Sequence, residues 1–118
     1  MNQEIKAALE AAGVNIEEAL SRLMNNEMLL KRLLLKFKDD KNFAGLEQAV
    51  LEKKYEDAFH CAHTLKGVAG NLGLEKLMNA DIAVVEKLRC QNFEGLEEEL
   101  EKVREAYTQV MEIIERME

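Results

Sequence analysis

The residues of this chain that are best suited to chemistry lie in one segment, FHCAHTLKGVAGNLGL, at positions 59 to 74. The segment holds both histidines of the chain, and a helical period of about 100° per residue separates its side chains into two faces. One face is apolar. The other face brings five residues within about 60° of His63, namely Phe59, His60, Lys66, Gly67 and Gly70. We therefore expect a helix with one side in the core and a second side available for chemistry.

The two glycines on this second face need an explanation. Glycine inside a helix costs about 0.5 to 1 kcal/mol relative to alanine, so Gly67 and Gly70 weaken the helix that contains them. Gly67 lies one turn after His63, where any side chain would crowd the imidazole ring. Its bare backbone leaves room for a bulky group on the ring and for the close approach of another protein.

The chemistry that fits these residues is the transfer of a phosphoryl group. An exposed imidazole is largely uncharged near neutral pH and is then a nucleophile, which is the role that we assign to His63. Lys66 follows three residues later and can bring its ammonium group to a phosphoryl oxygen. The chain has no GxxxxGK[ST] loop and no kinase signature that would bind ATP, so other molecules must supply and receive the phosphoryl group.

A second histidine and two cysteines allow other interpretations. His60 has His63 and Thr64 one turn later, without a lysine or a glycine, so we interpret it as a partner-facing or solvated residue. A metal ion held by His60, Cys61 and His63 is an alternative, because imidazole and thiolate bind zinc. Cys61, however, points about 160° away from His63, so we predict no metal site. We expect Cys61 and Cys90 to be reduced thiols that are partly buried.

The run HTLKGVAGNLG, residues 63 to 73, resembles the HxLKGxxxxxG signature of the histidine-containing phosphotransfer (HPt) domains of bacterial multistep phosphorelays. The resemblance extends to the segments GVNIEEALSRL and LLLKFKDD and covers roughly residues 13 to 115. It implies that His63 forms a phosphoramidate, that Lys66 assists electrostatically and that Gly67 keeps the site accessible. Some family members carry a Gln or Glu on the next helix that bonds the second ring nitrogen, and this chain has Val85 there, followed by Glu86.

The same resemblance implies a function and a set of partners. The chain would be a phosphorelay carrier that exchanges its phosphoryl group, in line, with an aspartate of a receiver domain, and not an enzyme. Receiver domains of response regulators or hybrid histidine kinases would supply Mg²⁺, so the chain would need no cofactor of its own. From the helical spacing we expect the partner-binding surface to comprise Phe59, His60, Lys66, Gly67 and Gly70, with burial at the helix boundary as the alternative for Phe59. The alternative function is a helical adaptor that binds a receiver or a kinase without accepting phosphate.

The elements that must position these residues are helices. The chain has 118 residues, is 47% hydrophobic and lacks proline, which favours one all-α domain over residues 1–118. Short connections make neighbouring helices antiparallel, so the sequence predicts an up-down four-helix bundle over about residues 15–117, preceded by an N-terminal segment, 1–14, with a short helix. The expected helices cover about residues 2–12, 16–24, 28–37, 43–53, 55–72, 74–89 and 93–117.

Polar and glycine residues mark several helix ends. Asn15 is expected to cap the second helix, with Glu18 in the capping-box position, and Asn92 is expected to cap the last helix. Gly13 and Gly73 follow helices as C-terminal stops.

One helix carries apolar residues on two sides. Leu30, Leu33, Leu34 and Phe37 share the face that we assign to the core. Met28 and Leu35 project from the opposite side. We expect the N-terminal segment of the chain, rather than a partner protein, to cover that side.

Charge and hydropathy exclude several classes of partner. The chain has 16 Lys and Arg and 23 Asp and Glu, which gives a formal charge of −7. This is the wrong sign for binding nucleic acid or anionic lipid. No stretch approaches the length of about 18 apolar residues that a membrane span needs, and the first residues do not form a secretory signal. We therefore expect a monomer in the cytoplasm.

Overall fold

The computed structural model describes residues 1–117 of the chain, and the all-α prediction is confirmed there. The elements are α1 (Gln3–Ala11), α2 (Ile16–Ser21), α3 (Glu27–Lys36), the short 3₁₀ helix η1 (Phe37–Asp39), α4 (Asn42–Leu51), α5 (Tyr55–Asn71), α6 (Glu75–Arg89) and α7 (Leu96–Arg116). No strand occurs in this range, where one isolated β-bridge joins Val14 to Leu74. None of the helices in residues 1–117 combines the length and the apolar character that crossing a bilayer requires.

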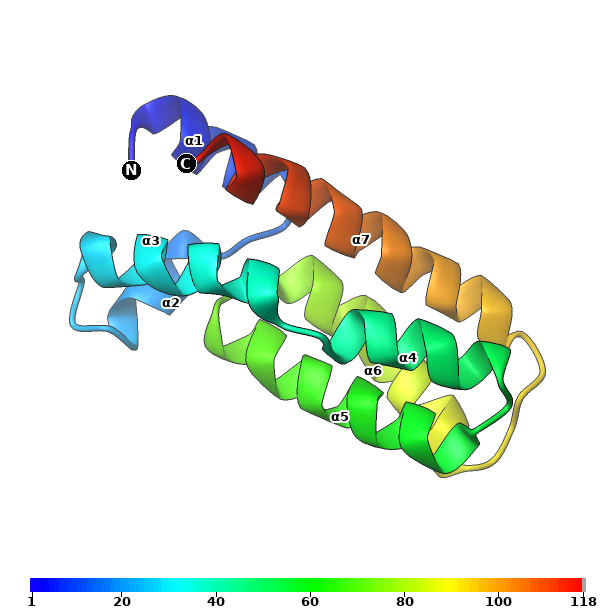
Figure 1. The fold of residues 1–118 in the computed structure, drawn as a ribbon. Helices are drawn as coiled ribbons and strands as arrows, with labels where there is room; N and C mark the ends of the chain where they lie inside the picture. Colours follow the sequence, from blue (N-terminus) through cyan, green and yellow to red (C-terminus); the bar gives the residue numbers. More distant parts are fainter. Residues whose placement is uncertain (118) are drawn as a thin grey trace.

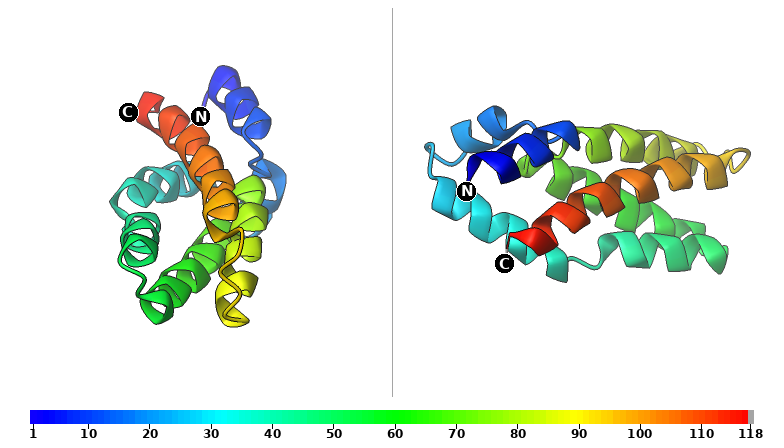
Figure 2. Two further views of the ribbon diagram at one scale, coloured as in Figure 1. Left: turned by 90° about the vertical axis from the view of Figure 1, so that its right-hand side faces the viewer. Right: turned by 90° about the horizontal axis from the view of Figure 1, so that it is seen from above.

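The last four helices form an elongated up-down bundle, as the sequence predicts (Figure 1). The molecule measures 42 × 24 × 21 Å along its principal axes, and α7 runs along most of the longest one. In this bundle α5 packs against α4 on one side and α6 on the other, and α6 packs against α7. Helices α1, α2 and α3 gather at one end, where α1 lies beside the C-terminal part of α7 (Figure 2). Helix α5, the segment with both histidines, is therefore held from two sides.

The core of the bundle is aliphatic, and a few polar and aromatic contacts close it between α4 and α7. The rings of Phe43 and Tyr107 stack with centroids 4.4 Å apart, and Arg104 Nε donates to Glu47 Oε2 over 2.7 Å. The largest fully buried side chains of the bundle helices are Leu46, Leu65, Leu77, Val84, Val85, Leu100, Val103 and Ile114. Burial of such side chains supplies about 1.5 to 3 kcal/mol each and holds α5 in place.

The turn after α5 is fastened to the N-terminal segment. Gly73 has a φ of 72°, and a Cβ there would lie 2.6 Å from the carbonyl oxygen of Asn15, so glycine is required for two reasons. The Asn15 backbone N–H donates to the Gly73 carbonyl over 2.7 Å. The Asn15 side chain caps α2 as predicted by accepting from the Glu18 N–H over 3.0 Å.

The other half of the predicted capping box is absent, and α2 is shorter than expected. The Glu18 carboxylate accepts from Arg22 over 2.8 Å instead of reaching back to Asn15. Helix α2 ends at Ser21 rather than at Met24, because Met24 and Asn25 adopt left-handed backbone conformations with φ of 56° and 61°. The turn that they form separates α2 from α3.

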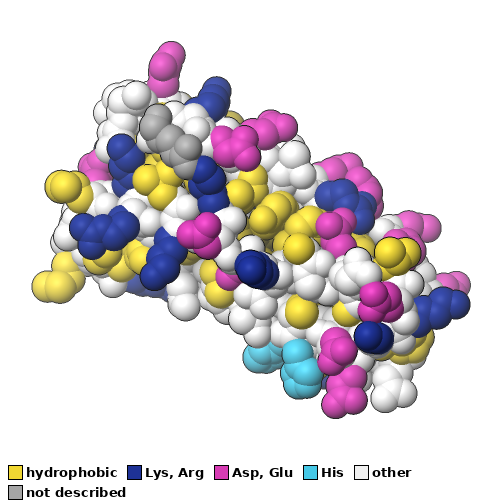
Figure 3. Space-filling view, viewed as in Figure 1, with side chains coloured by type: hydrophobic (Ala, Val, Ile, Leu, Met, Phe, Trp, Pro, Cys, Tyr) yellow, Lys and Arg dark blue, Asp and Glu magenta, His cyan; other side chains and the backbone are white. Residues whose placement is uncertain are grey.

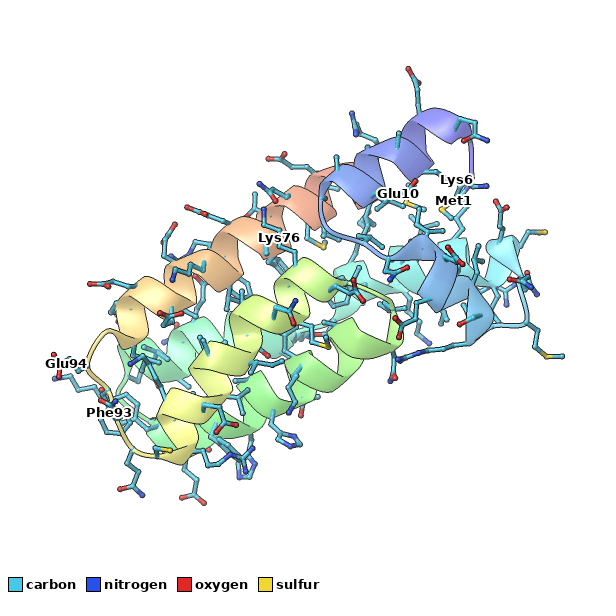
Figure 4. The ribbon with its side chains drawn as sticks, turned by 180° about the vertical axis from the view of Figure 1, so that it is seen from behind. Met1, Lys6, Glu10, Lys76, Phe93 and Glu94 are labelled. Carbon is cyan, nitrogen blue, oxygen red and sulfur yellow. The ribbon has the colours of Figure 1, made fainter. Side chains whose placement is uncertain are left out.

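The predicted start of the last helix is also wrong. Asn92 accepts from the Glu94 N–H over 3.3 Å and caps no helix. Gly95, with a φ of 75°, precedes α7, which begins at Leu96. Phe93 stacks on Tyr55 of α5 with ring centroids 3.8 Å apart, which keeps it in the α6–α7 connection labelled in Figure 4.

Two predictions of burial are corrected. Met28, in the first turn of α3, is 78% exposed, and of the two residues predicted to be covered Leu35 alone is partly buried. Helix α1 reaches this turn through an ion pair of 2.9 Å between Lys6 and Glu27, so it lies over Glu27 and not over Met28. Cys90 caps the C-terminus of α6 and is exposed at the end of the bundle, whereas Cys61 is partly buried.

Candidate functional site

The site is built on α5, whose sequence favours a helix with one small-residue face. Glu56 and Asp57 occupy its first turn, where negative charge interacts favourably with the helix dipole. The residues of α5 that are completely buried are Ala58, Ala62, Leu65 and Ala69. Because three of the four are alanines, α5 can lie close to its neighbours, and its opposite face remains in solvent.

His63 and His60 lie side by side on that solvent-exposed face. Both side chains are exposed, and the two histidines form one patch at the lower edge of the surface in Figure 3. The half-buried ring of Phe59 lies with its centroid 5.8 Å from the ring centroid of each histidine. Among residues 1–117 no group forms a hydrogen bond with the His63 ring. Its nitrogens are therefore free to attack an electrophile.

The surface next to His63 is open. A Cβ placed on Gly67 would meet no atom within 4 Å, so the backbone of α5 is bare one turn after the histidine. Lys66 is partly buried, and no ion pair or hydrogen bond joins it to another described residue. The structure thus brings together on one helix an imidazole without a hydrogen-bond partner, a lysine without an ion-pair partner and an accessible stretch of backbone.

Gly70 lies farther along the same helix and packs against α6. A Cβ there would be 3.2 Å from Met78 Sδ, so the methionine side chain would have to shift by a few tenths of an ångström to admit it. Its carbonyl oxygen accepts from Arg22 Nη1 over 3.0 Å. The space beside Gly70 is therefore limited by α6, and its predicted contact with a partner stays a prediction.

The antiparallel register of α5 and α6 shows what lies opposite each site residue. Gly70 faces Met78 at one end, and at the other end the Arg89 guanidinium lies over the Phe59 ring, 5.4 Å from its centroid. By this register His63 lies across from Val85, whose buried aliphatic side chain cannot hydrogen-bond to the ring. No side chain of α6 therefore fixes the tautomer of His63 in residues 1–117.

The structure adds a residue that sequence reasoning missed, Asp81 in the middle of α6. Its side chain is completely buried, and neither carboxylate oxygen has a hydrogen-bond partner among the described residues. Burial raises the pKa of Asp81 from 3.8 to about 7, and the positive charge of Lys66 offsets part of that rise. A signal was present, because Asp81 is spaced four residues after Leu77 and three before Val84, on the buried stripe of its helix.

A pocket of about 350 Å³ opens beside Phe59, on the side away from Gly67. It lies between α5, α6 and the start of the α6–α7 connection, and it is lined by Tyr55, Glu56, Phe59, Leu88, Arg89, Gln91 and Phe93. Arg89, which is ion-paired with Glu86 over 3.4 Å, and Glu56 place one charge of each sign on a largely aromatic surface. The exposed side of α5 with Phe59, His60 and His63 is called the histidine face. The pocket extends this face toward one end of the bundle.

The alternative of a metal site requires Cys61 to lie beside the two histidines. A Cβ on Gly45 of α4 would lie 2.9 Å from Cys61 Sγ, so Cys61 points toward α4 and away from His63. Residues 1–117 contain no group of three or more His, Cys, Asp or Glu residues placed to hold a metal ion.

The family comparison agrees with this geometry. A family model described as the Hpt domain matches residues 3–113. The chain belongs to the Hpt domain family. The predicted resemblance is thus confirmed, and the Hpt domain is the histidine carrier of phosphorelays, a family of phosphotransfer proteins that work with receiver domains and kinases. Comparisons with curated proteins and with solved structures gave no match.

Proposed function

We propose that this Hpt domain carries a phosphoryl group on His63, which it takes from a receiver-domain aspartate and passes to another receiver aspartate. The observation that carries the proposal is the exposed, unengaged imidazole of His63 beside the open backbone at Gly67. A receiver must bring its aspartyl phosphate to the attacking nitrogen in line, and such an approach needs a surface without obstruction.

The transfer step is a direct displacement at phosphorus. A ring nitrogen of His63 donates its lone pair to the phosphorus atom, and the bond between phosphorus and the aspartyl oxygen breaks. The electron pair of that bond leaves with the receiver carboxylate, while the proton on the second ring nitrogen stays on the ring. Mg²⁺ held by the receiver neutralises the phosphoryl oxygens, so we expect the Hpt domain to need no cofactor of its own.

Lys66 supports the transferred group electrostatically in this proposal. Its ammonium group has no ion-pair partner in residues 1–117, and Lys66 follows His63 by one turn on the same side of α5. A lysine interacts with phosphoryl oxygens as a point charge and does not need a fixed geometry. Lys66 therefore accelerates the transfer without being indispensable.

The receiver is expected to contact the whole histidine face. Phe59 and His60 extend the surface around His63, and Arg89 adds a cation at the edge of the neighbouring pocket. Apolar and aromatic contacts surrounded by complementary charge are typical of protein interfaces. A monomeric carrier in the cytoplasm, formed by residues 1–118 as one domain, remains our expectation.

A transfer assay tests this function. The protein is incubated with a phosphorylated receiver domain and Mg²⁺, and the product is analysed for acid-labile, base-stable phosphate that is then located by mass spectrometry. We expect phosphate on His63, retained acceptance by a His60→Gln variant and no acceptance by a His63→Gln variant. Absence of transfer from several receivers to the folded wild-type protein would contradict the proposal and favour the adaptor alternative.

A further inference from the structure

The buried carboxyl group of Asp81 has no role in the transfer step described above. Among residues 1–117, Asp81 is the one charged side chain in the buried core, and both of its oxygens lack a hydrogen-bond partner. Such a group costs stability unless something compensates for the loss of water. We therefore expect a function for this carboxyl group, which lies on the helix that packs against α5.

The position of Asp81 relates it to Lys66. In the register set by Gly70 opposite Met78, Asp81 lies across from Lys66 and Gly67, one turn from the level of His63. Lys66 interacts electrostatically with the Asp81 carboxylate without forming an ion pair within 4.0 Å. Lys66 is thus one turn from His63 along α5 and also interacts with the buried acidic group of α6.

The other neighbours of Asp81 contribute little charge. On α6 itself, residues 77 to 85 include no other ionisable side chain. Lys76 of α6, labelled in Figure 4, donates to Gln109 of α7 over 2.7 Å, which places Asp81 near the level of Arg104. Arg104 is paired with Glu47 of α4 and with Glu101 of its own helix, and Tyr107, one turn later on α7, is partly buried.

The remaining charges at that level of α7 are Lys102 and Glu105, and both are exposed to solvent. The buried side chains that α7 contributes there are Val103 and Ala106. On α5 the titratable group nearest to Lys66 is His63, which is also exposed. Lys66 is therefore the charged residue that affects the pKa of Asp81.

The burial of Asp81 makes its proton labile near neutral pH. Burial raises the pKa of Asp81 to about 7, because the charged form is deprived of water while the neutral form is not. Near pH 7 a substantial fraction of molecules therefore carries a neutral Asp81 and the rest carries a buried negative charge.

We propose that Asp81 is a buried counter-charge to Lys66 that couples phosphoryl transfer at His63 to the binding of a proton. When it is ionised, Asp81 draws the Lys66 ammonium toward α6 and repels the phosphoryl group. When it is protonated, Lys66 is released to the phosphoryl oxygens. Asp81 thus acts as a positioning residue through Lys66, and the inference rests on the proposed role of His63.

The coupling works in both directions. A phosphoryl group adds roughly 1.5 to 2 negative charges beside Lys66, and this charge disfavours ionised Asp81. Phosphorylation therefore takes up a fraction of a proton at Asp81, and a rise in pH through about 7 returns phosphoryl groups from the Hpt domain to the receiver.

The test compares equilibrium constants for phosphoryl transfer from one receiver to the wild-type protein and to an Asp81→Asn variant between about pH 5.5 and pH 8.5. At each pH the ratio of the two constants cancels every pH dependence that the two proteins share, including that of the receiver. We expect the ratio, wild type over variant, to fall about three- to tenfold as the pH rises from 6 to 8. In a Lys66→Met background the same comparison should show a much smaller change.

A measurement on the wild-type protein covers the case in which the Asp81→Asn variant does not fold. The ¹³C chemical shift of the Asp81 carboxyl is followed against pH before and after phosphorylation with phosphoramidate. We expect a titration midpoint near 7 that rises on phosphorylation. A ratio that does not change with pH, or a midpoint that phosphorylation leaves in place, would overturn the coupling alone, whereas a wild-type protein that accepts no phosphoryl group would overturn the function of His63 and the coupling with it.

Discussion

The two sides of α5 differ in how their unpaired polar groups meet solvent. On the outer side His63 is exposed, hydrogen-bonds to no other residue in 1–117, and has an open backbone beside it at Gly67. On the side that faces α6, the carboxyl group of Asp81 is completely buried and also lacks a partner. The first unpaired group is accessible to water, whereas the second is not. The comparison shows that phosphoryl transfer on the outer side depends on the open space at Gly67. On the inner side, the pH dependence depends on a carboxyl group that is buried away from solvent.

The largest effect is expected from removing the nucleophile on the outer side. His63→Gln should abolish phosphate acceptance, because glutamine has no nucleophilic nitrogen, while the helical circular-dichroism signal stays unchanged since the side chain is exposed. Incorporation of labelled phosphate measures this. The matched control is His60→Gln, which should retain acceptance. Phosphate on the His63→Gln protein would show that another residue is the acceptor.

A smaller but still large effect is expected from filling the open space. Gly67→Leu should fold, because a Cβ at this position meets no atom within 4 Å, yet it should slow transfer by about a hundredfold by displacing the receiver. Stopped-flow transfer kinetics and urea unfolding measure the two quantities.

Gly70→Leu is the matched control for this substitution. Its side chain would collide with Met78 of α6, so we expect loss of stability before loss of transfer. Equal transfer rates for wild type and Gly67→Leu would show that the receiver does not need the open space at Gly67.

The inner side predicts a change in stability that depends on pH. The pKa of Asp81 is raised from 3.8 to about 7 in the folded protein, so its contribution to stability is present below about pH 4 and is lost as the pH rises through 7. Asp81→Asn removes this titration and should therefore gain stability relative to wild type by about 2 kcal/mol between pH 5 and pH 8. Urea unfolding at the two pH values measures the difference. An advantage that is the same at both values would show that the carboxyl titrates normally.

The smallest effect on transfer is expected at the residue between the two sides. Lys66→Ala should slow transfer about tenfold without eliminating it, because Mg²⁺ on the receiver and the in-line geometry supply most of the stabilisation. A Lys76→Ala variant, which removes an exposed lysine of α6 that bonds to Gln109, is the control and should leave the rate unchanged. A rate for Lys66→Ala equal to that of wild type would remove the lysine from the mechanism.

The outer side could be predicted from the sequence because it depends on helical spacing alone. His63, Lys66 and Gly67 are close in sequence, so any helix over this segment places them on one side. The helix ends at Gly13 and Gly73 were predicted for the same reason, since the signals are local.

The inner side depends on contacts between segments far apart in sequence, and there the predictions were weaker. Asp81 is a polar residue on a buried stripe, and only the packing of α6 against α5 and α7 shows that water is excluded from it. In the same way, Phe93 was expected in α7 but stacks on Tyr55 of α5.

The most direct test of the carrier role of His63 is a relay between two receivers. One receiver is loaded with ³²P-labelled phosphate and mixed with a second, unlabelled receiver in the presence of this protein. The label should reach the second receiver with the wild-type protein and with His60→Gln, and should stay on the first with His63→Gln. Label that reaches the second receiver equally well with His63→Gln, or never with the folded wild-type protein, would contradict the role of His63 as the carrier.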